Sequence, residues 1–181
     1  MDVQPIERRH VSETSVELFA GMLRARIVDE RLAVLGDAGA IGFLPRGIGR
    51  EAALFGTVAA LEEGAWIFPT HCAWAISIAR GMSIATLVHR VAGDGLDPLK
   101  GHDMPSGLSA RAHRIASVSA PAATHLPHAV GVAMAARQRG EDVVSAALFD
   151  AIEVDAADFH SGLNFAGVMR APTLFVCRVR E

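Results

Sequence analysis

The sequence contains no tyrosine, two tryptophans and two cysteines among its 181 residues. The cysteines, Cys72 and Cys177, form no Cys-x-x-Cys pair and are too few for a disulfide framework. No apolar run reaches the roughly 20 residues that a membrane-spanning helix needs, and residues 1–10 lack the apolar region of a secretion signal. These absences argue against the secreted, disulfide-stapled and membrane classes, and they predict a cytoplasmic protein.

A strong charge of one sign is also absent. The formal net charge is −3 at pH 7 and both signs are spread along the chain, so no surface for nucleic acid is expected. Hydrophobic residues make up 51% of the chain, which is enough to bury a core. The length predicts a single domain over residues 1–181. Within it we expect a mainly helical part at 1–92, a long loop at 93–114 and an α/β core at 115–181.

The strongest local pattern lies near the C-terminal end of the sequence. Two apolar runs, 143–149 and 173–179, flank a helical stretch, which predicts a right-handed βαβ unit of a parallel sheet. Asp155 is suited to cap this helix, and Asp158 would lie in its first turn, where the helix dipole favours negative charge. Ligands of such sheets bind beyond the carboxyl ends of the strands. The turn after Phe149 is therefore where chemistry is expected.

Helical patterns dominate the rest of the chain. The first predicted helix runs from about Thr14 to Gly36, and its buried face is predicted from the recurring apolar residues Phe19, Leu23, Ile27 and Val34. Further helices are expected at 50–61, 73–80, 83–91 and 127–139, and short strands at 66–69 and 115–120.

Glycines mark two further features. Residues 39–49 form a glycine-rich loop, but their spacing fits neither the dinucleotide-binding nor the P-loop fingerprint, so they are weak evidence for phosphate binding. Gly131 and Ala135 lie four residues apart on the predicted 127–139 helix. Their small size predicts that another backbone approaches this helix closely.

Four stretches, in this order along the chain, resemble the alpha subunit of the thiamine-diphosphate-dependent first component of 2-oxo acid dehydrogenase complexes, of which the pyruvate and branched-chain enzymes are the best-known members. They are IVDERLAVLGDAGAIGFLPRGIGREAA (27–53), WIFPTHCAWAISIARG (66–81), SVSAPAATHLPHAVGVAMAARQRGED (117–142) and DFHSGLNFAGVMRAPTLFVC (158–177). The resemblance implies an α/β fold with a doubly wound parallel sheet of the thiamine-diphosphate-binding type, here truncated and with an N-terminal helical extension. It also implies a cofactor diphosphate bound through magnesium, and a beta subunit that completes the active site.

The sequence departs from this family at the expected metal ligands. The family normally has Gly-Asp-Gly after the first strand of the central unit, where the aspartate coordinates magnesium. A gapless comparison places Asp150, Ala151 and Ile152 there, so Asp150 falls one residue early and is a weak candidate ligand, and Ile152 adds bulk beside the phosphate. The second ligand, an asparagine in the family, corresponds to Arg180, whose guanidinium cannot coordinate a cation. We therefore expect no bound metal.

The positions that would face the organic cofactor have also changed. The family's diphosphate-binding Tyr-Arg corresponds to His71-Cys72, and the cofactor-ring segment Ser-Pro-Val-Gly-Thr-Gln corresponds to 120–125, which places Ala122 and His125 at the site. Scaffold residues persist while polar groups of the site differ in each segment. The sequence thus predicts a descendant that has lost thiamine diphosphate and magnesium.

Three functions remain open. The first is a non-catalytic pseudoenzyme that acts as a subunit or partner. The second is an active 2-oxo acid decarboxylase alpha subunit that uses thiamine diphosphate and magnesium and is completed by a beta subunit. The third is a repurposed enzyme that uses His71, Cys72 and His125 in the inherited pocket. A sheet shorter than that of the family needs a cover, so we expect a homo-oligomer or a beta-subunit-like partner over 173–179 or the 127–139 helix.

Overall fold

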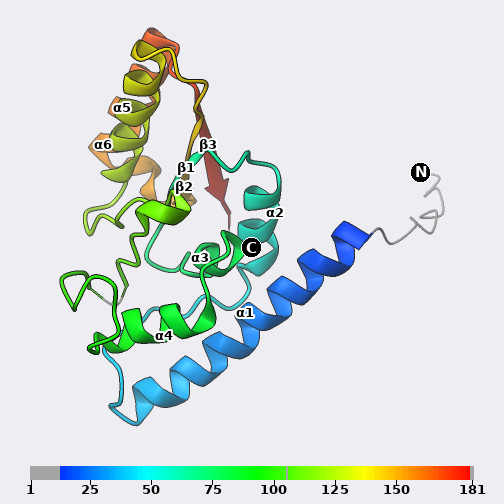
Figure 1. Ribbon diagram of the computed structural model, residues 1–181. Coiled ribbons are helices and arrows are strands. Elements are labelled where there is room, and N and C mark those ends of the chain that lie inside the picture. Colours follow the sequence, from blue (N-terminus) through cyan, green and yellow to red (C-terminus); the bar gives the residue numbers. More distant parts are fainter. Residues whose placement is uncertain (1–12, 105, 180–181) are drawn as a thin grey trace, which may run out of the picture.

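The computed structural model describes residues 13–104 and 106–179 (Figure 1). The helices are α1 (Glu13–Asp37), α2 (Glu51–Ala59), α3 (Ala75–Ala79), α4 (Ile84–Ala92), α5 (His125–Gln138) and α6 (Ala157–Met169). The strands are β1 (Trp66–Phe68), β2 (Ser145–Asp150) and β3 (Thr173–Arg178), and two short 3-10 turns are η1 (Arg111–His113) and η2 (Ala151–Asp155). None of the described helices is both long enough and apolar enough to cross a membrane.

The three strands form one parallel sheet in the order β1-β2-β3. Strand β2 lies in the middle, and its last residue, Asp150, pairs in register with Arg178 at the end of β3. Helix α6 connects β2 to β3, so the βαβ unit is confirmed. The helices expected along the chain are present as well, with ends that differ by a few residues from the predicted ones.

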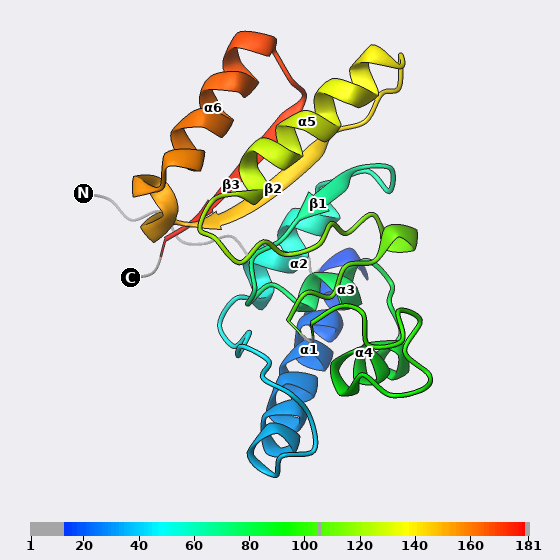
Figure 2. The ribbon, with the colours of Figure 1, turned by 90° about the vertical axis from the view of Figure 1, so that its left-hand side faces the viewer.

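The sheet lies between two layers of helices (Figure 2), with β1 and β2 largely buried and β3 partly exposed. On one face, Ala147 and Phe149 of β2 pack with residues of α5 and α6. On the other face, Leu148 of β2 and Ile67 of β1 join a core formed mainly by α1, α2, α3 and α4. Because successive residues of a strand point to opposite faces, both sets must be apolar. This explains the uninterrupted apolar run of β2, and it confirms the predicted α/β class.

The buried face of α1 is not the one that the sequence predicted. The side chains of Phe19, Leu23, Ile27 and Val34 are 62%, 47%, 49% and 62% exposed, respectively. The helix itself was predicted correctly, but the larger apolar residues lie outward rather than against the core.

The face of α1 that packs inward carries smaller residues. Ala25, Val28 and Leu32 are buried, and Gly21 lies against α2, where an added Cβ would be 2.4 Å from the ring carbon Cε1 of Phe55. A larger residue at position 21 would keep the two helices apart. The face of α1 with small residues is buried because it lets α1 and α2 pack closely. The size of the apolar residues alone therefore predicted the wrong buried face.

Two other sequence predictions need correction. In the predicted 115–120 strand, only Ile115 forms bridges, to Ile67 and Ala110, because the small and polar residues that follow bury too little surface to extend a ladder. Gly131 has open space beside it, whereas Gly162 of α6 is the point where α5 and α6 approach closely. An added Cβ at Gly162 would lie 3.0 Å from the Cβ of Leu126.

The long loop at 93–114 is held by one buried guanidinium. Arg90 of α4 forms ion pairs with Asp97 (3.3 Å) and Asp103 (2.7 Å), and it donates a hydrogen bond to the carbonyl oxygen of Ser109 at 2.5 Å. Burial by itself would raise the pKa of Asp97, but the N–H donors of Gly101 and Leu99, together with the charge of Arg90, hold this pKa below its usual value.

We expect Asp97→Ala to lower the free energy of unfolding at pH 7 by about 3 kcal/mol, because it leaves Arg90 buried without one of its two carboxylates. A carboxylate with a lowered folded-state pKa stabilises the protein above its unfolded pKa, and this contribution is lost as the pH falls through the folded value. The difference between the variant and the parent should therefore shrink below about pH 4. Urea unfolding followed by circular dichroism measures both effects.

Glu141→Ala is the matched control, since Glu141 forms an exposed ion pair with Arg139. Such a pair contributes little to stability, so the unfolding midpoint should not change measurably. Equal effects of the two variants would contradict a loop held by a buried ion pair.

Candidate functional site

The carboxyl edge of the sheet, where chemistry was expected, brings opposite charges together. The carboxylate of Asp150, at the end of β2, forms an ion pair with the guanidinium of Arg178 at the end of β3. Both side chains are largely buried. The candidate metal ligand is thus already paired with a cation, which opposes the approach of a second cation. Arg180, the other predicted position, lies outside the described residues.

Glu153 closes the turn that follows β2. Its carboxylate accepts hydrogen bonds from the backbone N–H of Asp150 (2.8 Å) and from the backbone N–H of Ala123 (2.8 Å). The first bond is the capping arrangement of a residue three positions into a helical turn, and the Asp-x-x-Glu spacing was a signal for it in the sequence. The second bond joins this turn to the 120–125 segment, and only the tertiary structure reveals it.

The neighbouring residues of the 120–125 segment are bonded to the same part of the fold. The hydroxyl of Thr124 donates to the carboxylate of Asp158 in α6 at 2.9 Å. The ring Nε2 of His125 lies 2.6 Å from the carbonyl oxygen of Leu148 in β2, and it must donate this bond because a carbonyl only accepts. His125 is also only 3% exposed. Its position is therefore that of a core histidine which fixes α5 to the sheet.

The remaining positions at the gapless metal site offer no ligand atoms from their side chains. Ala151 has an inert methyl group, and Ile152 has an aliphatic side chain that is 86% exposed. Ala122 lies exposed on the loop before α5. These three residues shape the backbone of the site but contribute no charge.

His71 and Cys72 lie in the turn between β1 and α3, also at the carboxyl edge. Both are half-buried, and the turn is closed by a hydrogen bond from the N–H of Ala73 to the carbonyl of Thr70 at 2.9 Å. In the described part of the chain, no hydrogen bond or ion pair joins either side chain to His125. Nor does any group of three His, Cys, Asp or Glu side chains within residues 13–104 and 106–179 have the geometry to hold a metal ion.

The glycine-rich loop before α2 is bonded internally in a similar way. The N–H of Gly47 donates to buried Asp29 at 2.7 Å, and the N–H of Gly49 donates to Glu51 at 2.9 Å. Each carboxylate is also paired with an arginine, Arg46 or Arg26. The N–H groups of Gly47 and Gly49 therefore serve to dock the loop on α1 and α2, and they are not free for a phosphate.

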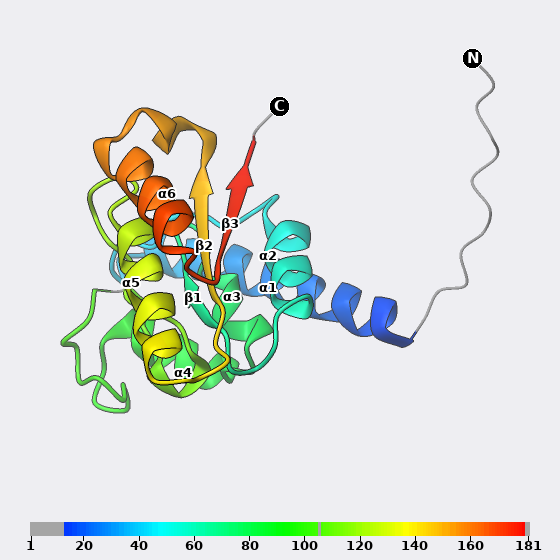
Figure 3. The same cartoon turned by 90° about the horizontal axis from the view of Figure 1, so that it is seen from above.

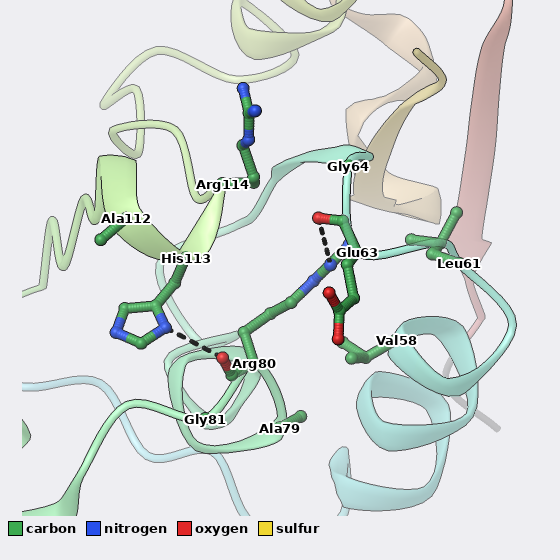
Figure 4. Close-up of a pocket in the computed structure, with 10 residues that line it drawn as sticks. All are labelled: Val58, Leu61, Glu63, Gly64, Ala79, Arg80, Gly81, Ala112, His113 and Arg114. Atoms are coloured by element: carbon green, nitrogen blue, oxygen red, sulfur yellow. Dashed lines mark hydrogen bonds between the residues drawn. The ribbon is translucent and has the colours of Figure 1, made fainter. Parts of the chain in front are cut away.

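A cavity of about 680 Å³ lies at the opposite, amino edge of the sheet (Figure 4). Arg80 extends into it and donates hydrogen bonds to the carbonyl oxygens of Glu62, Glu63 and Ala65 at 3.1–3.2 Å. Burial lowers the pKa of Arg80, and the charge of Glu63 partly opposes this effect. His113 contacts the carbonyl of Arg80 through Nδ1 at 2.9 Å. The polar groups of this cavity thus hold two loops together.

This chain has a parallel sheet between layers of helices and an acidic turn at the carboxyl edge of β2. Comparison with known proteins identifies its family. The chain belongs to the dehydrogenase E1 component family, whose model matches residues 20–179. The resemblance seen in the four sequence stretches is thereby confirmed.

Three similar proteins are alpha subunits of 2-oxoisovalerate dehydrogenase. The chain is 34% identical to the 2-oxoisovalerate dehydrogenase subunit alpha of Bacillus subtilis over 91% of this chain and 51% of that protein. It is 30% identical to the mitochondrial 2-oxoisovalerate dehydrogenase subunit alpha of Dictyostelium discoideum, over 92% of this chain and 38% of the relative. The mitochondrial 2-oxoisovalerate dehydrogenase subunit alpha 2 of Arabidopsis thaliana is 31% identical, over 92% of this chain and 35% of that protein. The chain spans about half the length, or less, of these relatives.

The residues at the carboxyl edge do not fit the family's cofactor, thiamine diphosphate held through magnesium. A magnesium site needs several oxygen ligands in near-octahedral geometry, whereas the Asp150 carboxylate is paired with Arg178. A diphosphate needs N–H donors, whereas those of Ala123 and Asp150 donate to Glu153. Asp150, Glu153 and Asp158 also place three carboxylates around the turn, and negative charge repels a diphosphate.

Replacement of Glu153 tests this closed turn. We expect Glu153→Ala to lower the free energy of unfolding by about 1–2 kcal/mol, because two backbone N–H groups lose their acceptor. Glu153→Gln keeps one acceptor oxygen and should lose less. Thermal unfolding of the variants measures both. Glu62→Ala is the control, since Glu62 is exposed; a loss as small as that of the control would mean that Glu153 does not hold the turn.

Proposed function

We propose that this chain is a non-catalytic relative of E1 alpha subunits, a pseudoenzyme that acts as a subunit or binding partner and uses neither thiamine diphosphate nor magnesium. The observation that carries the proposal is the position of the Glu153 carboxylate. It accepts hydrogen bonds from Asp150 and Ala123, two backbone N–H groups at the carboxyl edge of the sheet. A carboxylate that belongs to the chain thus occupies donors that an incoming phosphate would require.

Electrostatics strengthens this argument. A diphosphate that displaced Glu153 would leave that carboxylate nearby, and Asp158 would remain bonded to Thr124 in the adjacent helix. Binding would then cost both the existing hydrogen bonds and the repulsion between like charges. A magnesium ion normally offsets such repulsion, but Arg178 competes with it for Asp150.

A partner role accords with the surface of the sheet. Strand β3 has no neighbouring strand on its outer side within the described residues, and Leu174 in it is 44% exposed. Open strand edges in proteins are normally covered. The three relatives named above are all alpha subunits, which supports a beta-subunit-like chain as the partner that covers β3. A second copy of this chain is the alternative partner.

The alternative is an active 2-oxo acid decarboxylase alpha subunit, and the 34% identity to the Bacillus subtilis protein favours it. This alternative requires that a beta subunit rearranges the turn, so that Glu153 releases Ala123 and Asp150 leaves Arg178. Cofactor binding therefore separates the two functions.

Calorimetry is the direct test. We expect no binding of thiamine diphosphate with Mg²⁺ at up to about 100 μM, equivalent to less than roughly 5.5 kcal/mol of binding free energy. The titration is run on the chain alone and again with any co-encoded beta subunit, with the Bacillus subtilis alpha subunit as a positive control. Tight magnesium-dependent binding in either titration would refute the pseudoenzyme and establish the active subunit.

The repurposed enzyme is tested separately, through the reactivity of Cys72. A nucleophilic thiol reacts faster than a structural one of equal or greater exposure. Cys177 is more exposed than Cys72 and serves as the reference within the chain. We expect iodoacetamide to alkylate Cys72 no faster than Cys177, as measured by peptide mass spectrometry over time. Selective alkylation of Cys72 that His71→Ala abolishes would favour new chemistry at this turn.

A further inference from the structure

Helix α1 carries an exposed apolar face from Val16 to Ile27, and the exposed Glu30 separates this part from Val34 on the same side. The residues are Val16, Phe19, Leu23, Ile27 and Val34, between 47% and 62% exposed, and we refer to them as the outer stripe. With 3.6 residues per turn, these positions fall on one side of the helix. The N-terminal half of α1 extends beyond the rest of the fold (Figures 1 and 3).

The opposite side of α1 provides its buried contacts with the core. Ala25, Val28 and Leu32 are buried there, and Gly21 contacts α2. A surface helix needs only one apolar face to join a core. A second face of large apolar side chains is therefore not required for folding, and a group of neighbouring exposed apolar side chains marks an interaction site.

Charged residues beside the outer stripe indicate what binds to it. Glu17, Arg24 and Arg31 are seven residues apart, so they lie on one flank of the stripe, about two turns from each other. All three are exposed, and no hydrogen bond or ion pair within the described residues occupies them. The flank is acidic at the N-terminal end of the helix and basic toward its C-terminal end. Such a flank is complementary to itself when two copies run in opposite directions.

We propose that the outer stripe binds the outer stripe of a second copy of this chain, with the two α1 helices antiparallel. A two-fold axis near the middle of α1 then places Leu23 against Ile27 of the second copy, and Val16 against Val34. On the flank, Glu17 faces Arg31 of the second copy, and the symmetry repeats this pair. In a parallel arrangement, the flanks that carry Glu17 and Arg31 would lie on opposite sides of the interface, so these charged pairs would not form.

The shape of the surface agrees with this arrangement. A cavity of about 360 Å³ lies at the junction of α1 and α2, and Phe19 and Leu23 of the outer stripe form one of its walls. Ile27 of the second copy would lie over Leu23 and therefore at the rim of this cavity. The proposal goes beyond the proposed function and does not depend on it, because neither the cofactor site nor β3 takes part.

Sedimentation velocity of the full chain tests the interface. We expect a dimer at micromolar concentration, and Leu23→Glu should raise its dissociation constant at least about tenfold, since it places two charges in the centre of the apolar contact. Val168→Glu is the control, because Val168 is a 71% exposed apolar residue on α6 and lies outside the outer stripe. It should leave the dissociation constant unchanged. A monomer at up to about 100 μM would overturn the proposal, as would equal weakening by both variants.

Charge reversal tests the antiparallel geometry. Glu17→Arg and Arg31→Glu each replace two attractive pairs with two repulsive ones, so each should weaken the dimer about tenfold. The double variant E17R/R31E restores both pairs with the charges exchanged and should return the dissociation constant to within about threefold of the parent. Both positions are exposed, so folding is preserved, and circular dichroism checks this. If the double variant is as weak as the single ones, the antiparallel pairing is wrong.

Discussion

The structure depends on the burial of strand β2 on both faces. A strand in the middle of a parallel sheet loses water from both sides, so its neighbours above and below must be apolar and its polar atoms must find partners within the protein. The hydroxyl of Ser145, at the start of β2, donates to the carbonyl of Ala129 in α5 at 2.8 Å. The carbonyl of Leu148 accepts from His125, and the N–H of Asp150 donates to Glu153. The polar contacts of β2 thus orient α5 and the turn before α6.

The same requirement explains why the candidate site is closed. The backbone donors and the charged groups at the carboxyl edge of the sheet also need bonding partners. Here, side chains of the chain itself make these bonds, through Glu153, the pair of Asp150 with Arg178, and the pair of Thr124 with Asp158. A site whose donors and charges are satisfied internally gains stability without a ligand. It follows that contacts within the chain hold the carboxyl edge of this sheet.

Helix α1 shows a second consequence of layered packing. It contributes one face to the core, and close contact with α2 at Gly21 determines which face that is. The outer stripe is left free by this choice. Core packing and surface recognition therefore use different residues of one helix, and changes on one face need not disturb the other.

The sequence by itself determined the elements and the family. The apolar runs of β2 and β3, the helix between them and the four family-like stretches are local patterns, and local backbone preference with short-range periodicity is sufficient to identify them. The tertiary structure decided which face of α1 is buried, that the 115–120 segment contributes only a bridge at Ile115, and that His125 is a core residue bonded to Leu148. It also decided that Glu153 bonds to Ala123, thirty residues away in the sequence. Each of these outcomes depends on which distant residues meet when the layers pack, and a pattern within one segment carries no information about its neighbours in space.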